Sequence, residues 1–194
     1  MGTWRWVLGI AAAVAAHAAI IDRVAIVVGN TVITETEVLR EVRLTEFMNG
    51  QPLDLDAEAR KAAADRLVDQ QLIRNEMAIG AYPMPTDADV AEMLRNFRQQ
   101  HFNSVAQYRA ALEKFGVKEE ELKEHLRWQL AAIRFTDLRF QPNLPAPSSD
   151  TQSANRLKAG AQGLAGTNVD QQLDSWLKEQ RQNTRVQFKK GAFQ

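Results

Sequence analysis

The feature that most constrains the fold is a series of helix start and stop signals across residues 34–140. Most of the starts place a hydroxyl or carboxyl side chain before an apolar periodic segment, where its oxygen can accept a hydrogen bond from a first-turn backbone N–H. Glycine or proline follows most segments, as is typical of helix ends. Five consecutive helices with short connections predict a helical bundle. We expect them to begin near Thr34, Asp54 or Asp56, Thr86, Ser104 and Lys118. The first, second, fourth and fifth are expected to end near Gly50, Gly80, Gly116 and Phe140, and the third carries Val90, Met93, Leu94 and Phe97.

A short β-hairpin is expected immediately before the first helix. Val24–Val28 is rich in β-branched residues, Gly29-Asn30 fits a two-residue turn, and Thr31–Ile33 supplies the returning strand. The fold class predicted for the N-terminal part is therefore mainly α, with a short hairpin at its start.

The first 18 residues have the pattern of a secretory signal peptide. Arg5 supplies the positive charge, Val7–Ala16 is apolar, and Ala16-His17-Ala18 fits a small-x-small cleavage site. A retained membrane anchor is the alternative, but the apolar run Val7–Ile21 is shorter than the roughly 20 residues that span a bilayer. We therefore expect cleavage after Ala18, export to an oxidising, ATP-poor compartment, and no stable membrane insertion.

The composition changes after the fifth expected helix. Gln141–Thr167 is rich in proline, serine and glycine and has few large apolar residues, so we interpret it as a flexible linker. A sixth helix is expected from Asn168, and Arg185–Phe188 alternates like an edge strand. The expected organisation is a signal peptide at 1–18, a helical domain at 19–140, a linker at 141–167 and a C-terminal helix and strand at 168–194.

A single amphipathic helix after a linker cannot bury its own apolar stripe, so we expect the C-terminal segment to pack on the N-terminal bundle. The charges agree with this arrangement. Glu35–Asp69 holds nine acidic and five basic residues, whereas Lys178–Gln194 holds five basic residues and one acidic residue. Two independent, solvated faces are the alternative, because exposed ion pairs contribute little to stability.

Composition excludes several chemistries. The chain has no cysteine, and its 24 basic residues balance 24 acidic ones, which argues against nucleic-acid binding. Glu121 and His125 can share a helix face, but two ligands do not make a metal site, and His125 is expected to be solvated among charged neighbours. No catalytic constellation is present, so we expect no catalytic residue, metal or cofactor.

Six large apolar side chains are candidates for a peptide-binding surface, because methionine and aromatic side chains suit a surface that accepts many apolar sequences. Helical spacing favours a core position for Phe97 and Phe115. The other aromatic residues, Phe102, Tyr108 and Trp128, lie off the main apolar stripes, so we expect partial exposure there. The six candidates are Met93, Phe97, Phe102, Tyr108, Phe115 and Trp128.

Three segments carry a family resemblance. The stretch Ile21–Thr34, IDRVAIVVGNTVIT, resembles the opening of the mature N-terminal domain in SurA-like periplasmic chaperones. Leu67–Ile73, LVDQQLI, is similar to the family's second-helix segment, and Glu121–Arg127, ELKEHLR, is similar to its last long N-domain helix. The similarity covers roughly Ile21–Phe140 and Val169–Phe188.

The resemblance implies a periplasmic holdase that shields unfolded outer-membrane or secreted proteins without ATP, with the N-terminal region and a C-terminal helix forming one chaperone core. Family members usually carry parvulin-type prolyl isomerase domains between these parts, and residues 141–167 are too few and too polar for one. Isomerase activity is therefore not carried over. Two alternatives remain: a structural or adaptor protein that binds one folded envelope partner, and an enzyme such as a degenerate isomerase.

Overall fold

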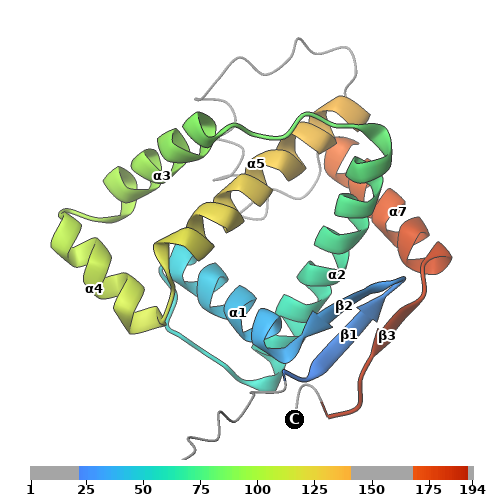
Figure 1. The fold of residues 1–194 in the computed structure, drawn as a ribbon, viewed down its shortest axis with the longest axis horizontal. Coiled ribbons are helices and arrows are strands. Elements are labelled where there is room, and N and C mark those ends of the chain that lie inside the picture. Colours follow the sequence, from blue (N-terminus) through green and yellow to red (C-terminus); the bar gives the residue numbers. More distant parts are fainter. Residues whose placement is uncertain (1–21, 141–167, 192–194) are drawn as a thin grey trace, which may run out of the picture.

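The computed structural model describes residues 22–140 and 168–191, so the expected signal peptide and linker lie outside the described residues. The described chain folds as a helical bundle with a small sheet (Figure 1), which confirms the predicted fold class. Its elements, in chain order, are β1 (Val24–Val28), β2 (Thr31–Thr34), α1 (Glu35–Asn49), α2 (Ala57–Gly80), α3 (Asp87–His101), α4 (Val105–Phe115), α5 (Glu119–Phe140), α7 (Asn168–Asn183) and β3 (Val186–Phe188).

The sheet is antiparallel and has the strand order β2-β1-β3. The expected hairpin is present, and Gly29 supplies the positive φ of 59° that its tight turn requires. On the other side of β1, the backbone N–H of Gly29 donates to the carbonyl oxygen of Arg185 at 2.8 Å, and that of Lys189 donates to Ala25, also at 2.8 Å. The central strand is thus paired with a strand from the far end of the described chain.

The caps expected from the sequence set most helix starts. Thr34 and Glu37 form a complete capping box at α1, and Thr86 and Asp89 form another at α3. At α4 the Ser104 hydroxyl accepts from the backbone of Gln107, as expected. The Gln107 side chain, however, accepts from the preceding residue, Asn103, so this box is only half formed.

The end of α2 differs from the prediction. Gly80 was expected to stop the helix, yet it is still helical, and Ala81 takes the left-handed conformation with φ 51°. A Cβ on Gly80 would collide with the ring of Tyr82. The glycine therefore makes room for an aromatic side chain, and the alanine bears the backbone strain.

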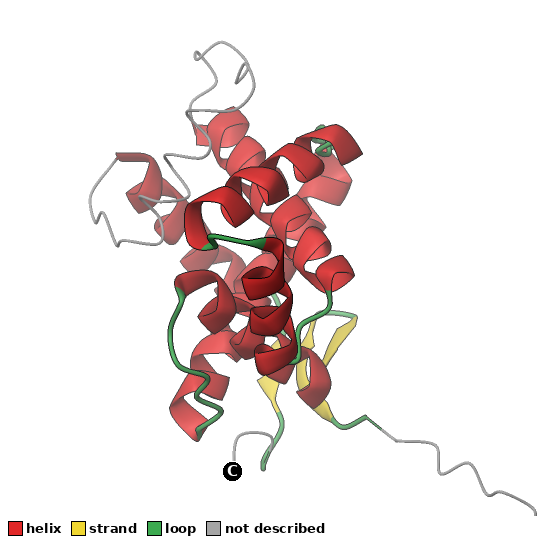
Figure 2. Ribbon diagram, turned by 90° about the vertical axis from the view of Figure 1, so that its left-hand side faces the viewer, coloured by secondary structure: helices red, strands yellow, loops and turns green. Residues whose placement is uncertain are grey.

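Three groups of buried side chains form the core. One lies between the sheet, α1 and α2, a second lies between α1, α3, α4 and α5, and a third lies between α2, α5 and α7. The helices stack in a block beside the sheet, as Figure 2 shows. The group of buried side chains between the sheet, α1 and α2 is centred on Ile26, Val28, Val38, Val42 and Val68.

The third group contains the docking contact of α7. Trp176 is only 7% exposed, and its ring centroid lies 5.4 Å from that of Phe135. Beside it, the guanidinium of Arg181 donates to the carboxylate of Asp69 at 2.7 Å and to that of Asp65 at 3.3 Å. These contacts join the basic C-terminal segment to the acidic N-terminal segment, as the distribution of charges along the sequence predicted.

We expect a chain that ends at Phe140 to unfold at a lower temperature than the full chain, or to aggregate. It loses β3 and α7, and removal of a buried tryptophan such as Trp176 alone typically costs about 3 kcal/mol. Thermal unfolding followed by circular dichroism measures the effect. The matched control is Arg181→Gln in the full chain, which removes two partly exposed ion pairs, each worth about 1 kcal/mol or less. An unchanged melting curve for the shortened chain would contradict the docking.

The Gly80 and Ala81 pair gives a second prediction. Ala81→Gly relieves a positive φ and should raise the free energy of unfolding by about 1 kcal/mol. Gly80→Ala would gain helix propensity at an unhindered site, but here it displaces Tyr82 from its contact with Phe135, so we expect the melting temperature to fall. A rise for Gly80→Ala would show that Tyr82 does not require the space.

Candidate functional site

The structure separates the six candidate residues into two groups. Four of them surround Phe47, which α1 inserts between α3 and α4, and Met93 packs against the same buried group. Trp128 lies apart in the core between α2, α5 and α7. Phe47 was not among the predicted binding residues, because its helical spacing indicates only that it belongs to the apolar stripe of its helix. Its ring centroid lies 5.7 Å from Phe97, 5.9 Å from Phe102, 6.4 Å from Tyr108 and 5.7 Å from Phe115. We call these five rings the aromatic cluster.

The expected core positions of Phe97 and Phe115 are confirmed, because both are buried. Phe102 is half-buried, in line with the expected partial exposure, and Met93 is half-buried at the edge of the cluster. The expectation of exposure is wrong for Tyr108, which is 1% exposed, and for Trp128, which is 9% exposed.

Other elements cover these two side chains. The guanidinium carbon of Arg98 lies 4.8 Å from the centroid of the Tyr108 ring, and that of Arg74 lies 4.5 Å from the Trp128 ring. Burial, together with the nearby carboxylate of Glu119, raises the pKa of Tyr108, so its phenol is neutral at physiological pH.

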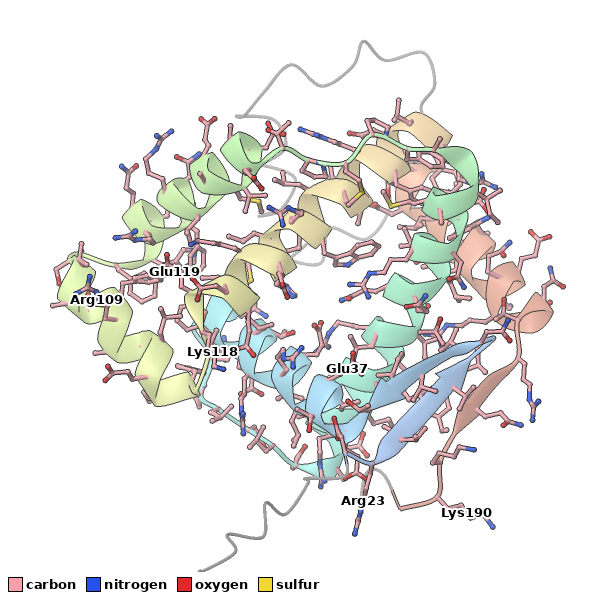
Figure 3. All side chains as sticks on the ribbon, viewed as in Figure 1. Arg23, Glu37, Arg109, Lys118, Glu119 and Lys190 are labelled. Carbon is pink, nitrogen blue, oxygen red and sulfur yellow. The ribbon has the colours of Figure 1, made fainter. Side chains whose placement is uncertain are left out.

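Two surface depressions flank α4. The larger, of about 400 Å³, lies at its C-terminal end, where the backbone turns at Gly116 and leads into α5. Figure 3 shows two of the residues that border it, Arg109 on α4 and Lys118 just before α5. The smaller, of about 300 Å³, lies at the N-terminal end of α4 against the end of α3, and its apolar side is formed by Phe102, Val105 and Tyr108. We call it the α3–α4 depression.

The α3–α4 depression brings part of the aromatic cluster to the surface. Val105 is 50% exposed and Phe102 is half-buried beside it, whereas the remainder of the cluster lies in the core. In Figure 1, α3 and α4 lie on the side of the molecule opposite α7. An apolar side chain of a ligand can therefore reach the edge of the cluster here without disturbing the docked C-terminal segment.

A buried polar group links α1, α2 and α5. The Glu41 carboxylate accepts hydrogen bonds from Arg66 Nε at 3.4 Å and from Gln70 Nε2 at 3.3 Å, and its other oxygen lies 3.6 Å from His125 Nδ1. The expectation that His125 is solvated is wrong, because its side chain is packed between these helices and Gln129. Its Nε2 faces the Gln129 amide nitrogen at 3.1 Å, so Nε2 accepts and Nδ1 carries the proton toward Glu41.

Burial dominates the acid–base behaviour of this group. It lowers the pKa of His125 to about 4, with the charges of Arg66 and Arg74 acting in the same direction. It raises the pKa of Glu41 in spite of the neighbouring Arg66. Within residues 22–140 and 168–191, no three metal-ligating side chains come together, and Glu121 is engaged with Arg40 at 3.2 Å.

The chain is similar to Chaperone SurA of Pectobacterium atrosepticum, with 29% identity over 160 residues, which cover 78% of this chain and 37% of that protein. The similarity is distant. The chain thus spans little more than a third of the length of the curated relative that it matches. No family model matches the chain. In the part of the chain that the structure describes, none of the helices has the length and apolar character needed to cross a bilayer.

The pKa of His125 predicts a loss of stability in acid. Below about pH 6.5 the unfolded chain binds a proton on this histidine that the folded chain does not bind until about pH 4. The free energy of unfolding should therefore fall between these pH values, by up to about 3 kcal/mol from this group. We expect the melting temperature of His125→Gln to depend less on pH across this window than that of the original chain.

Glu41 acts in the opposite sense and provides the control. Because its pKa is raised, the folded chain binds this proton before the unfolded chain does, which offsets part of the acid loss. Glu41→Gln should therefore make the decline toward low pH steeper. Parallel pH profiles for the original chain and His125→Gln would contradict the burial of a neutral histidine.

Proposed function

We propose that this protein is an ATP-independent chaperone that binds unfolded or partly folded polypeptides. The observation that carries the proposal is the similarity to Chaperone SurA over 78% of the chain. Further support comes from the fold, in which the two ends of the described chain form one compact body through β1–β3 pairing and α7 docking. Holdase activity without a prolyl isomerase step is part of the proposal, and the expected clients are outer-membrane or secreted proteins in the periplasm.

The proposed binding surface is narrower than the six candidate residues. All four buried candidates are assigned a structural role: Phe97, Tyr108 and Phe115 pack α1, α3 and α4 together, and Trp128 packs in the core between α2, α5 and α7. Clients are proposed to contact the α3–α4 depression, where part of the aromatic cluster meets solvent. Weak apolar contact of this kind tolerates many sequences, as a holdase requires.

The small size of this exposed apolar area favours one alternative function, that of a structural or adaptor protein. A structural or adaptor protein needs a restricted surface that fits a single folded partner, and the α3–α4 depression is restricted in this way. Affinity capture with the full chain separates the two functions. Many unfolded chains among the captured proteins support the chaperone, whereas one stoichiometric folded partner supports the adaptor.

The main test measures aggregation of a chemically unfolded β-barrel protein after dilution, without ATP. We expect the full chain to suppress light scattering at low molar excess, and we expect no acceleration of proline isomerisation in a short peptide. Val105→Ser removes exposed apolar area from the depression and should weaken suppression about threefold to tenfold.

The matched control is Ile79→Ser. Ile79 is 83% exposed at the end of α2, so this change removes a comparable exposed aliphatic side chain away from α4. It should leave suppression unchanged. No suppression by the original chain at several-fold molar excess would overturn the chaperone proposal, and equal effects of the two substitutions would overturn the proposed surface.

A further inference from the structure

The α3–α4 depression combines an apolar side with positive charge. Phe102, Val105 and Tyr108 form the apolar side, and Arg95 and Arg98 border it from α3. None of the residues that line it is acidic. The other depression on α4 differs, because Glu113 lines it together with Arg109 and Lys118. The two ends of α4 therefore present different electrostatic surfaces to a ligand.

The two arginines of the depression are only weakly compensated. Arg95 forms an ion pair with Glu92 at 3.6 Å, one turn earlier on the exposed face of α3. Arg98 forms no ion pair within 4 Å among residues 22–140 and 168–191, although its charge acts on the carboxylate of Glu119, which itself binds Lys123 at 3.1 Å. Such exposed pairs contribute little energy, so a ligand carboxylate can compete for both guanidinium groups.

The positions of the side chains around Arg98 limit which ligands the α3–α4 depression can bind. Its guanidinium carbon lies 4.8 Å from the Tyr108 ring centroid, and the Phe102 ring centroid lies 5.3 Å from the same point. Because Arg98 covers the buried Tyr108 ring, Phe102 is the aromatic ring that a ligand can reach beside this cation, within a space of about 300 Å³. The Tyr108 phenol is neutral at physiological pH, and burial raises its pKa further, so it adds no negative charge beside Arg98.

We infer that the α3–α4 depression binds an extended polypeptide segment in which an aromatic side chain is followed, two residues later, by aspartate or glutamate. In an extended chain, side chains two residues apart point to the same side and are about 7 Å apart, which suits an aromatic surface beside a guanidinium. Arginine binds carboxylates through two parallel N–H donors, and the aromatic ring of the ligand packs on Phe102 and Val105. The inference rests on the chaperone function proposed above and specifies the segments that it binds.

The test uses the full chain and two fluorescent peptides with blocked ends. One contains Phe-x-Asp and the other contains Phe-x-Asn at the same position, and fluorescence anisotropy gives the two dissociation constants. We expect the aspartate peptide to bind about fivefold to tenfold more tightly at low ionic strength, with the difference shrinking as salt is added.

Substitutions then locate the effect. Arg98→Gln should abolish the preference for aspartate, and Arg98→Lys should retain part of it, because lysine keeps the charge and loses the paired donors. Arg109→Gln, at the other end of α4, should leave it unchanged. Circular dichroism checks that each variant is folded. The partial effect of Arg98→Lys remains informative if Arg98→Gln fails to fold.

Other outcomes overturn the inference. Equal affinity for the two peptides would exclude recognition of the carboxylate, and loss of the preference in Arg109→Gln would place it elsewhere. A third peptide has asparagine at the internal position and an unblocked terminal carboxylate; if it binds as tightly as the aspartate peptide, the depression recognises chain ends instead. Aggregation suppression without a preference between the peptides refutes this inference alone. Absence of both suppression and peptide binding refutes the proposed function as well.

Discussion

The structure depends on the pairing of β1 with a strand from the other end of the described chain. An isolated two-stranded hairpin is marginally stable in water, and the β1–β2 hairpin is supported here by α1 and α2 on one face and by β3 at its edge. The addition of β3 makes β1 a central strand, and the preceding helix, α7, places Trp176 in the core between α2 and α5. The N-terminal and C-terminal parts therefore stabilise each other, whatever the length of chain between them.

Helix α1 contacts three parts of the interior that differ in side-chain type: one is aliphatic, one is aromatic and one is polar. Val38 and Val42 pack under the sheet, and Phe47, further along the same helix, is the centre of the aromatic cluster. Glu41, on the same helix, is buried in a polar group with Arg66 and His125. A buried carboxylate costs free energy unless it is paired, and Arg66 and Gln70 pair it here. The loss of stability in acid comes instead from His125, because the folded chain resists protonation of this buried histidine.

Local sequence signals predicted most of the fold because their physical cause is local. The capping boxes at Thr34 and Thr86 and the hairpin turn at Gly29 each depend on a few neighbouring residues. The end of α2 was placed one residue early, because the space needed by Tyr82 and not the backbone angle determines where the glycine stands. Helical periodicity locates a face, but it does not reveal which side chain of another element covers that face.

The candidate surface shows that limit most clearly. Trp128 lies off the apolar stripe of its own helix, yet Arg74 from α2 covers its ring. Tyr108 is similarly covered by Arg98 and packed against Phe47. Substitutions of these rings would change stability and binding together, so a loss of activity would not distinguish the two. Substitutions at the exposed edge of the α3–α4 depression leave the interior intact, and only they can separate recognition of a client from the integrity of the bundle.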